Sequence, residues 1–125
     1  MSIDLFDKQT EEICFSINSW QWKAIVEEIR RQRIISEEII DGLHQSYCEN
    51  GLTIEQCRLV ASVLREKVIA KLSGTERILL DGTRTNVPDD YIFHRVEVEK
   101  NYSTSKLALT KFVECLETCN GFEVC

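Results

Sequence analysis

Apolar residues recur at helical spacing in four stretches of the chain, and these stretches predict four helices. The strongest pattern covers residues 54–72, where a capping box of Thr53 and Gln56 precedes it and Ser73-Gly74 follows it. The other three helices are expected over 19–33, 37–49 and 104–119. Because the stripe in 54–72 is the broadest, we expect this helix to lie at the centre of the core.

Polar residues mark the expected starts and ends of these helices. Side-chain caps are predicted at Asn18 (with Gln21 as its partner), Ser36, and Ser103 or Ser105. Asn50-Gly51 is expected to end the second helix and Asn120-Gly121 the last, because glycine adopts the left-handed cap conformation at little cost.

The strand signals are fewer and lie mainly near the ends of the chain. Residues 12–17 are rich in strand formers, and 122–125 are expected to pair beside them. Residues 91–99 show an imperfect strand pattern, 78–80 fit a short strand or a turn of helix, and 1–11 fit a frayed end or a short helix. The predicted fold is a mainly helical α+β domain over residues 1–125. It has about four helices and a small sheet of the N-terminal strand, the C-terminal segment and residues 91–99.

Charge and composition narrow the class of function. The chain has 125 residues, a net charge of −6 and 29% charged residues, which is typical of one soluble globular domain. The acidic balance argues against nucleic-acid binding, and no apolar run approaches a membrane span. The first residues lack the basic and apolar regions of a signal peptide. We therefore expect a cytoplasmic protein with reduced thiols, no cofactor, and no nucleic-acid or membrane partner.

Six cysteines offer the main candidate chemistry. Cys115 and Cys119 are four residues apart on one predicted helix face, and Cys125 can fold back toward them through the turn at Gly121. His44 and Cys48 have the same spacing on the second helix. These five side chains are candidate zinc ligands, and a cysteine beside a histidine is also a candidate nucleophile.

The spacings favour a structural role for the cysteines over a metal site. No C-x-x-C pair is present, and five of the six cysteines stand where an apolar residue is expected. On this interpretation Cys57, Cys115 and Cys119 pack as small buried hydrophobes, and Cys14 belongs to the first strand. A disulfide between Cys119 and Cys125 is geometrically feasible but is less expected in a reducing compartment.

Trp20 is a candidate binding residue. It lies two residues before Trp22 at the start of a predicted helix, so the two side chains point about 200° apart. Trp22 fits the buried stripe. Trp20 is then either an exposed anchor for a partner or a cover for the strand at 12–17 or the N-terminal segment.

Two short motifs carry a resemblance to a known group of proteins. Asn18-x-Trp20-x-Trp22 opens the first helix, and Asn101-Tyr102-Ser103 precedes the last one. The closing positions are Phe112, Leu116, Cys119, Gly121, Phe122, Val124 and Cys125. Over about residues 12–125 the chain resembles a bacterial family of small cytosolic domains. The resemblance implies a soluble bacterial domain and carries over no catalytic residue.

These observations favour a protein that binds rather than catalyses. The expected partner is another protein or a second copy of the chain, as in an immunity-type or regulatory protein that neutralises a basic partner. The alternative is a metal-binding or cysteine-dependent enzyme that uses His44 with Cys48, or Cys115 with Cys119 and Cys125.

Overall fold

The structure is a computed structural model that describes residues 2–45, 47–87 and 102–125. One antiparallel sheet has the strand order β2-β1-β7-β3, and a smaller one has the order β5-β4-β6. The strands are β1 (Ser2–Asp7), β2 (Ile13–Asn18), β3 (Gly51–Leu52), β4 (Arg77–Leu79), β5 (Arg84–Thr85), β6 (Ser103–Ser105) and β7 (Phe122–Val124). The helices are α1 (Ser19–Gln32), α2 (Glu37–Leu43), α3 (Ile54–Lys67), the 3₁₀ turn η1 (Ile69–Lys71) and α4 (Lys106–Thr118).

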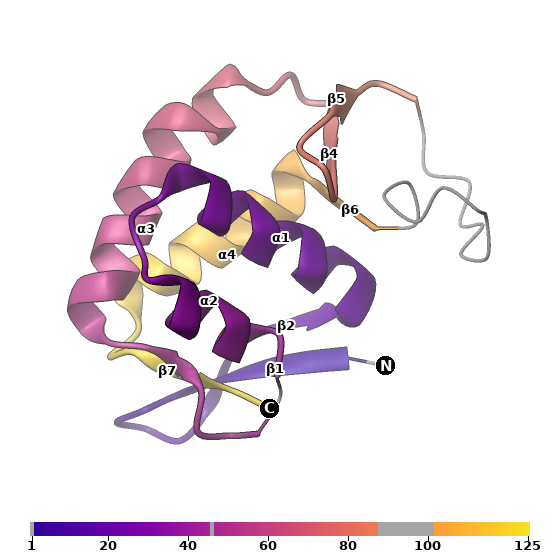
Figure 1. The fold of residues 1–125 in the computed structure, drawn as a ribbon. Helices are drawn as coiled ribbons and strands as arrows, with labels where there is room; N and C mark the ends of the chain where they lie inside the picture. The colour runs from indigo at the N-terminus through magenta and orange to yellow at the C-terminus, as the bar shows by residue number, and fades with distance from the viewer. Residues whose placement is uncertain (1, 46, 88–101) are drawn as a thin grey trace.

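The fold is α+β, as the sequence predicts. The described residues contain four α-helices, and the predicted single sheet is in fact two. Figure 1 shows the two sheets apart, with α1 and α4 running between them. The ends of the chain meet in the larger sheet, where β7 pairs with β1. Helices hold more of the described residues than strands do.

Local capping explains where most helices begin. The side chain of Asn18 accepts from the amide of Gln21 at 2.8 Å, and Thr53 and Gln56 form both bonds of a capping box. Ser105, rather than Ser103, caps α4 by accepting from Ala108. These starts confirm the predictions, whereas Ser36 makes no side-chain cap bond to α2.

The second helix is shorter than predicted. It ends at Leu43, and the chain then turns back so that Cys48 and Asn50 form backbone bonds with Val124. The role assigned to Gly51 was wrong, because this residue is extended in β3 instead of capping a helix. A Cβ at Gly51 would lie 1.7 Å from the carbonyl oxygen of Phe122, so glycine is needed here for close approach.

Three further predictions need correction. The start of the chain is a strand, β1, where a frayed end or a short helix was expected for 1–11. Strand β7 pairs with β1 and not with β2, which lies on the other side of β1. Helix α3 ends at Lys67, and η1 follows it. The short strand alternative at 78–80 is confirmed in β4, and the expected strand at 91–99 lies outside the described residues.

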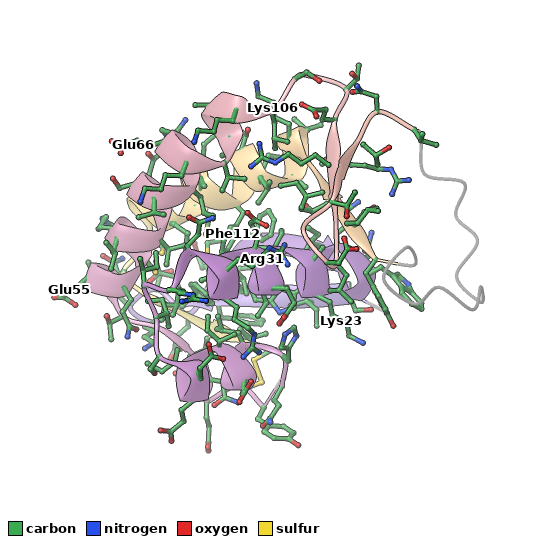
Figure 2. All side chains as sticks on the ribbon, turned by 45° about the horizontal axis from the view of Figure 1, so that its top comes forward. Lys23, Arg31, Glu55, Glu66, Lys106 and Phe112 are labelled. Carbon is green, nitrogen blue, oxygen red and sulfur yellow. A yellow bond between two sulfur atoms is a disulfide. The ribbon has the colours of Figure 1, made fainter. Side chains whose placement is uncertain are left out.

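Aromatic rings form the centre of the core. The ring of Phe112 on α4 lies 5.5 Å from that of Phe15, 5.6 Å from that of Trp22 and 6.4 Å from that of Phe122. Trp22 is buried, and its indole N–H donates to the carbonyl of Leu43 at 2.8 Å. Figure 2 shows Phe112 among the elements, whereas Glu55 and Glu66 extend outward from α3. The larger sheet is therefore joined to α1 and α4 through one apolar cluster.

No helix within residues 2–45, 47–87 and 102–125 has the length and apolar character needed to cross a membrane.

Candidate functional site

A β-bulge controls the direction of Cys14. Leu5 pairs with Phe15, but the next residue of β1, Phe6, pairs with Ile13, so Cys14 is an extra residue without a partner of its own. An extra residue in one strand turns the side chains around it. Cys14 is half-buried and its Sγ lies 2.9 Å from the Sγ of Cys115, whereas Ile13 is 52% exposed.

Four cysteines meet in the interior beside this bulge. Cys115 and Cys119 are one turn apart near the end of α4, and Cys57 lies on α3, which packs against α4. The Sγ of Cys119 is 3.7 Å from that of Cys57, and both residues are buried. All four carry free thiols. We call Cys14, Cys57, Cys115 and Cys119 the thiol cluster.

Contact among the thiols changes their acidity. Hydrogen bonding from Cys115, and then from the other two members of the cluster, lowers the pKa of Cys119. Contact with Cys119, together with burial, raises the pKa values of Cys57 and Cys115. Contact with Cys115 lowers the pKa of Cys14, but contact with Cys119 and burial outweigh it and raise the pKa to about 11. Cys119 is therefore the thiol that most readily ionises.

The other two cysteines form a disulfide. Cys48 bonds to Cys125, 77 residues away in sequence, and a disulfide is visible as a yellow bond beside α2 in Figure 2. Six reduced thiols were expected, and this bond corrects that expectation. The disulfide considered between Cys119 and Cys125 is also wrong, because Cys119 points into the cluster while Cys125 joins Cys48.

His44 and Cys48 do not act as a pair in this arrangement. The Nε2 of His44 lies 2.7 Å from a carboxylate oxygen of Glu27, and the sulfur of Cys48 is bonded to Cys125. Contact with His44 and Arg30 outweighs burial and lowers the pKa of Glu27. A metal site or nucleophile built on Cys48 or Cys125 would first require reduction of the disulfide. In the part of the chain that the structure describes, no three or more His, Cys, Asp or Glu side chains are arranged to hold a metal ion.

Trp20 is stacked on another aromatic ring. Its centroid lies 4.8 Å from that of Tyr102 with an angle of 25° between the planes, and the Nζ of Lys23 lies 4.8 Å from the Tyr102 centroid. Tyr102 immediately precedes β6, so this contact joins the start of α1 to the smaller sheet. The two covers considered for Trp20, the strand at 12–17 and the N-terminal segment, did not include this one.

Strand β2 is the long edge of the larger sheet. It spans six residues, none of them charged, whereas β3 at the opposite edge spans two. Asp4 exchanges both backbone bonds with Cys125, so its backbone groups point toward β7. In an antiparallel ladder the opposite residue, Ser16, then faces away from β1 with its own N–H and C=O.

A groove runs along this edge between β2 and α4. It has a volume of about 250 Å³ and is lined by Phe15, Ser16, Ile17, Gln21, Ser105, Leu107, Ala108 and Lys111. Leu107 is 65% exposed, although it is a large apolar residue. Open backbone groups beside a groove with apolar side chains are what an added strand requires.

The sequence predicts neither the complete thiol cluster nor the groove between β2 and α4. The thiol cluster contains Cys57, which is expected only to pack in the core, and Cys14, which is expected only as part of the first strand. Their contacts with α4 depend on how β2 and α3 pack against that helix, and spacing along the chain does not give this. The available signal for the groove was the uncharged segment Ile13–Asn18, which is unusual for an edge strand.

Comparison of the chain with protein-family models, with curated proteins and with solved structures gives no match in any of the three. The resemblance at Asn18-x-Trp20-x-Trp22 and the closing motif therefore stays a prediction, and the function is inferred from the geometry of the described residues.

Proposed function

We propose that this protein is a binding module that accepts an extended segment of a partner protein along the free edge of β2. The observation that carries the proposal is the outward-facing backbone of Ser16 beside the groove formed with α4. An incoming strand would bond to Ser16 and place alternate side chains over Ile17 and Leu107.

The sequence of the edge supports this use. Proteins usually protect edge strands with charged residues or proline, and β2 has neither over its six residues. Ile13, at the start of β2, is 52% exposed, and Leu107, which lines the groove, is 65% exposed. An unprotected edge next to exposed apolar side chains is a favourable docking surface for one strand.

Charge favours a different protein over a second copy. Each chain carries a net charge of −6, so two copies repel each other, whereas a basic partner is attracted. The proposed partner is therefore a basic protein that presents an extended, partly apolar segment. Neutralisation of such a partner, as in an immunity-type or regulatory protein, is the role that we propose.

The test compares two exposed leucines on different helices. Leu107→Glu alters the groove, and Leu59→Glu on α3 alters a site away from it, where Leu59 is 45% exposed. Peptides selected from a displayed library with the unmodified protein should lose at least tenfold in affinity for Leu107→Glu and bind Leu59→Glu unchanged. Equal binding by both variants would exclude the groove.

A second variant tests the backbone bond itself. Ser16→Pro removes the outward N–H of β2 and leaves the backbone bonds between β1 and β2 in place, and Ser16→Ala is the control for the hydroxyl bond to Asp4 that it also removes. It should weaken peptide binding while hydrogen exchange in the unmodified complex shows new protection at Ser16. If native mass measurement instead shows a dimer that Ser16→Pro dissociates, the occupant of the edge is a second copy.

A cytoplasmic location also stays a proposal. The Cys48–Cys125 disulfide is a reason to test it, because a reducing cytoplasm normally keeps thiols reduced. Alkylation of the protein in intact cells, followed by mass mapping of these two cysteines, gives their oxidation state in place. Full alkylation of both would agree with the cytoplasm.

A further inference from the structure

The thiol cluster differs from ordinary buried cysteines in its sulfur–sulfur contacts. The Sγ atoms of Cys14 and Cys115 are 2.9 Å apart, compared with about 2.05 Å in a disulfide. A buried cysteine that only fills space needs no second sulfur at that distance. The two residues come from different elements, β2 and α4, and are separated by 101 positions in sequence.

The bulge in β2 is an independent sign that the contact is specific. Cys14 has no partner residue in the pairing of β1 with β2, so the ladder between these strands does not require it. Its effect is to aim the Cys14 thiol at α4. Bulges are over-represented at sheet edges, such as β2, and next to active sites, where they reorient a side chain.

Access to the cluster is graded. Cys57, Cys115 and Cys119 are buried, with exposures of 0%, 7% and 3%, and Cys14 is half-buried. A molecule from solvent therefore meets Cys14 first, and access selects Cys14 over Cys119, which ionises more readily but is buried. Cys115 lies directly behind it, and Cys119 and Cys57 lie deeper at a mutual distance of 3.7 Å.

We propose that Cys14 and Cys115 are a reversible disulfide site, in which Cys14 reacts with a low-molecular-weight disulfide such as oxidised glutathione and Cys115 resolves the product. In the first step the Cys14 thiolate attacks one sulfur of the external disulfide. The external S–S bond breaks, a mixed disulfide forms on Cys14, and the leaving thiolate takes up the proton that Cys14 released.

The second step completes the exchange. The Cys115 sulfur attacks the Sγ of Cys14, the mixed disulfide breaks, and the second external thiol leaves with the proton of Cys115. Two protein thiols are oxidised and one external disulfide is reduced to two thiols. The new bond joins β2 to α4.

The test uses the full chain with Cys48→Ser and Cys125→Ser, so that only the four cluster thiols remain. Incubation with oxidised glutathione, followed by mass measurement and peptide mapping, should show the loss of two hydrogen atoms and a crosslink between Cys14 and Cys115. Adding Cys115→Ser should instead trap one glutathione on Cys14. Adding Cys14→Ser should abolish at least nine-tenths of the reaction.

A matched control distinguishes this pair from general oxidation of the cluster. Cys57→Ala removes a deeper thiol and should leave the Cys14–Cys115 crosslink in place. The peptide map of the unsubstituted chain gives the same answer if a variant fails to fold. A crosslink between other cysteines, no oxidation at all, or a tightly bound zinc ion that protects all four thiols would overturn the proposal.

Discussion

The disulfide pair, Cys48 and Cys125, and the thiol cluster each include one cysteine that flanks β7 in sequence, but they differ in the kind of contact between their sulfur atoms. At the end of β7, Cys125 is bonded covalently to Cys48, an exposed residue with a positive φ of 59°. Before its start, Cys119 belongs to a buried cluster in which no bond is formed. The first set joins the ends of two segments that are distant in sequence, whereas the second holds β2, α3 and α4 together by contact. Spacing along a helix identifies Cys115 and Cys119 of the cluster but neither set in full.

The disulfide is expected to have the largest effect on stability. A crosslink across 77 residues restricts the unfolded chain, so Cys48→Ser with Cys125→Ser should lower the free energy of unfolding by about 4 kcal/mol. Urea denaturation of the oxidised protein and of the double variant measures the difference. The reduced unsubstituted protein is the control and should match the double variant. A decrease of less than about 1 kcal/mol in the free energy of unfolding would mean that the disulfide contributes little to stability.

A polar substitution should destabilise the thiol cluster more than it destabilises the exposed position of Cys48. Cys57 has 0% exposure, so Cys57→Ser buries a hydroxyl group and should cost about 2 kcal/mol. Cys57→Ala should cost about 1 kcal/mol, because it removes only one atom from an apolar site. In reduced protein, Cys48→Ser at the exposed position should change stability by less than about 0.5 kcal/mol. Equal losses at Cys57 and Cys48 would remove the distinction.

Asp7 holds the turn that follows the cluster. Its carboxylate accepts from the amides of Asn120, Gln9 and Thr10. The bond from Asn120 is the main cause that lowers the pKa of Asp7. Asp7→Asn should therefore cost about 1.5 kcal/mol at neutral pH, because the charged acceptor is lost.

The pH dependence gives the sign of this effect. Because the folded pKa of Asp7 is lower than the ordinary value of 3.8, its contribution is complete above that value and disappears as the pH falls through the folded pKa. The deficit of Asp7→Asn should then shrink in the most acidic samples of a thermal denaturation series. Asp4→Asn on the same strand is the control and should change stability little at neutral pH. A deficit that stays constant down to acid would contradict the assignment.

Raising the pH from 7 to 9 should leave the fold unchanged and affect only reactivity. The pKa of Cys14 is raised to about 11, so its thiolate fraction grows about tenfold for each pH unit in this range. The rate of iodoacetamide labelling at Cys14, followed by peptide mapping, should grow in the same proportion. Cys57, which is fully buried, should stay unlabelled throughout. A labelling rate that does not vary with pH would show that Cys14 is not the thiol that titrates.

The sequence predicted the features that depend on neighbouring residues. The capping box of Thr53 and Gln56 and the cap at Asn18 locate the starts of two helices, because each bond spans three residues. Strand β1 was missed since Asp7 occupies an inward position beside Ile3 and Leu5 and hides their alternation. Its carboxylate is tolerated there only because Asn120, far along the chain, donates to it.

The candidate site depended on long-range pairing and could be predicted only in part. Cys115 and Cys119 were recognised as one helix face, and the structure places both in the cluster. Their partners Cys14 and Cys57 come from other elements, and a strand pattern cannot indicate whether its pairing contains a bulge. Likewise Gly51 was interpreted through its backbone freedom, whereas its role comes from the proximity of Phe122.

The bulge means that β2 could be one residue shorter without a change in how it pairs with β1. β2 contains one residue more than its register with β1 uses, and that residue is Cys14. Removing it would leave Leu5 opposite Phe15 and Phe6 opposite Ile13, now as neighbours in an unbroken ladder. A shortened chain could thus keep the hairpin and lose only the thiol. The fold therefore does not require a residue at position 14, and the residue that is present there places a sulfur atom against Cys115 at the edge of the core.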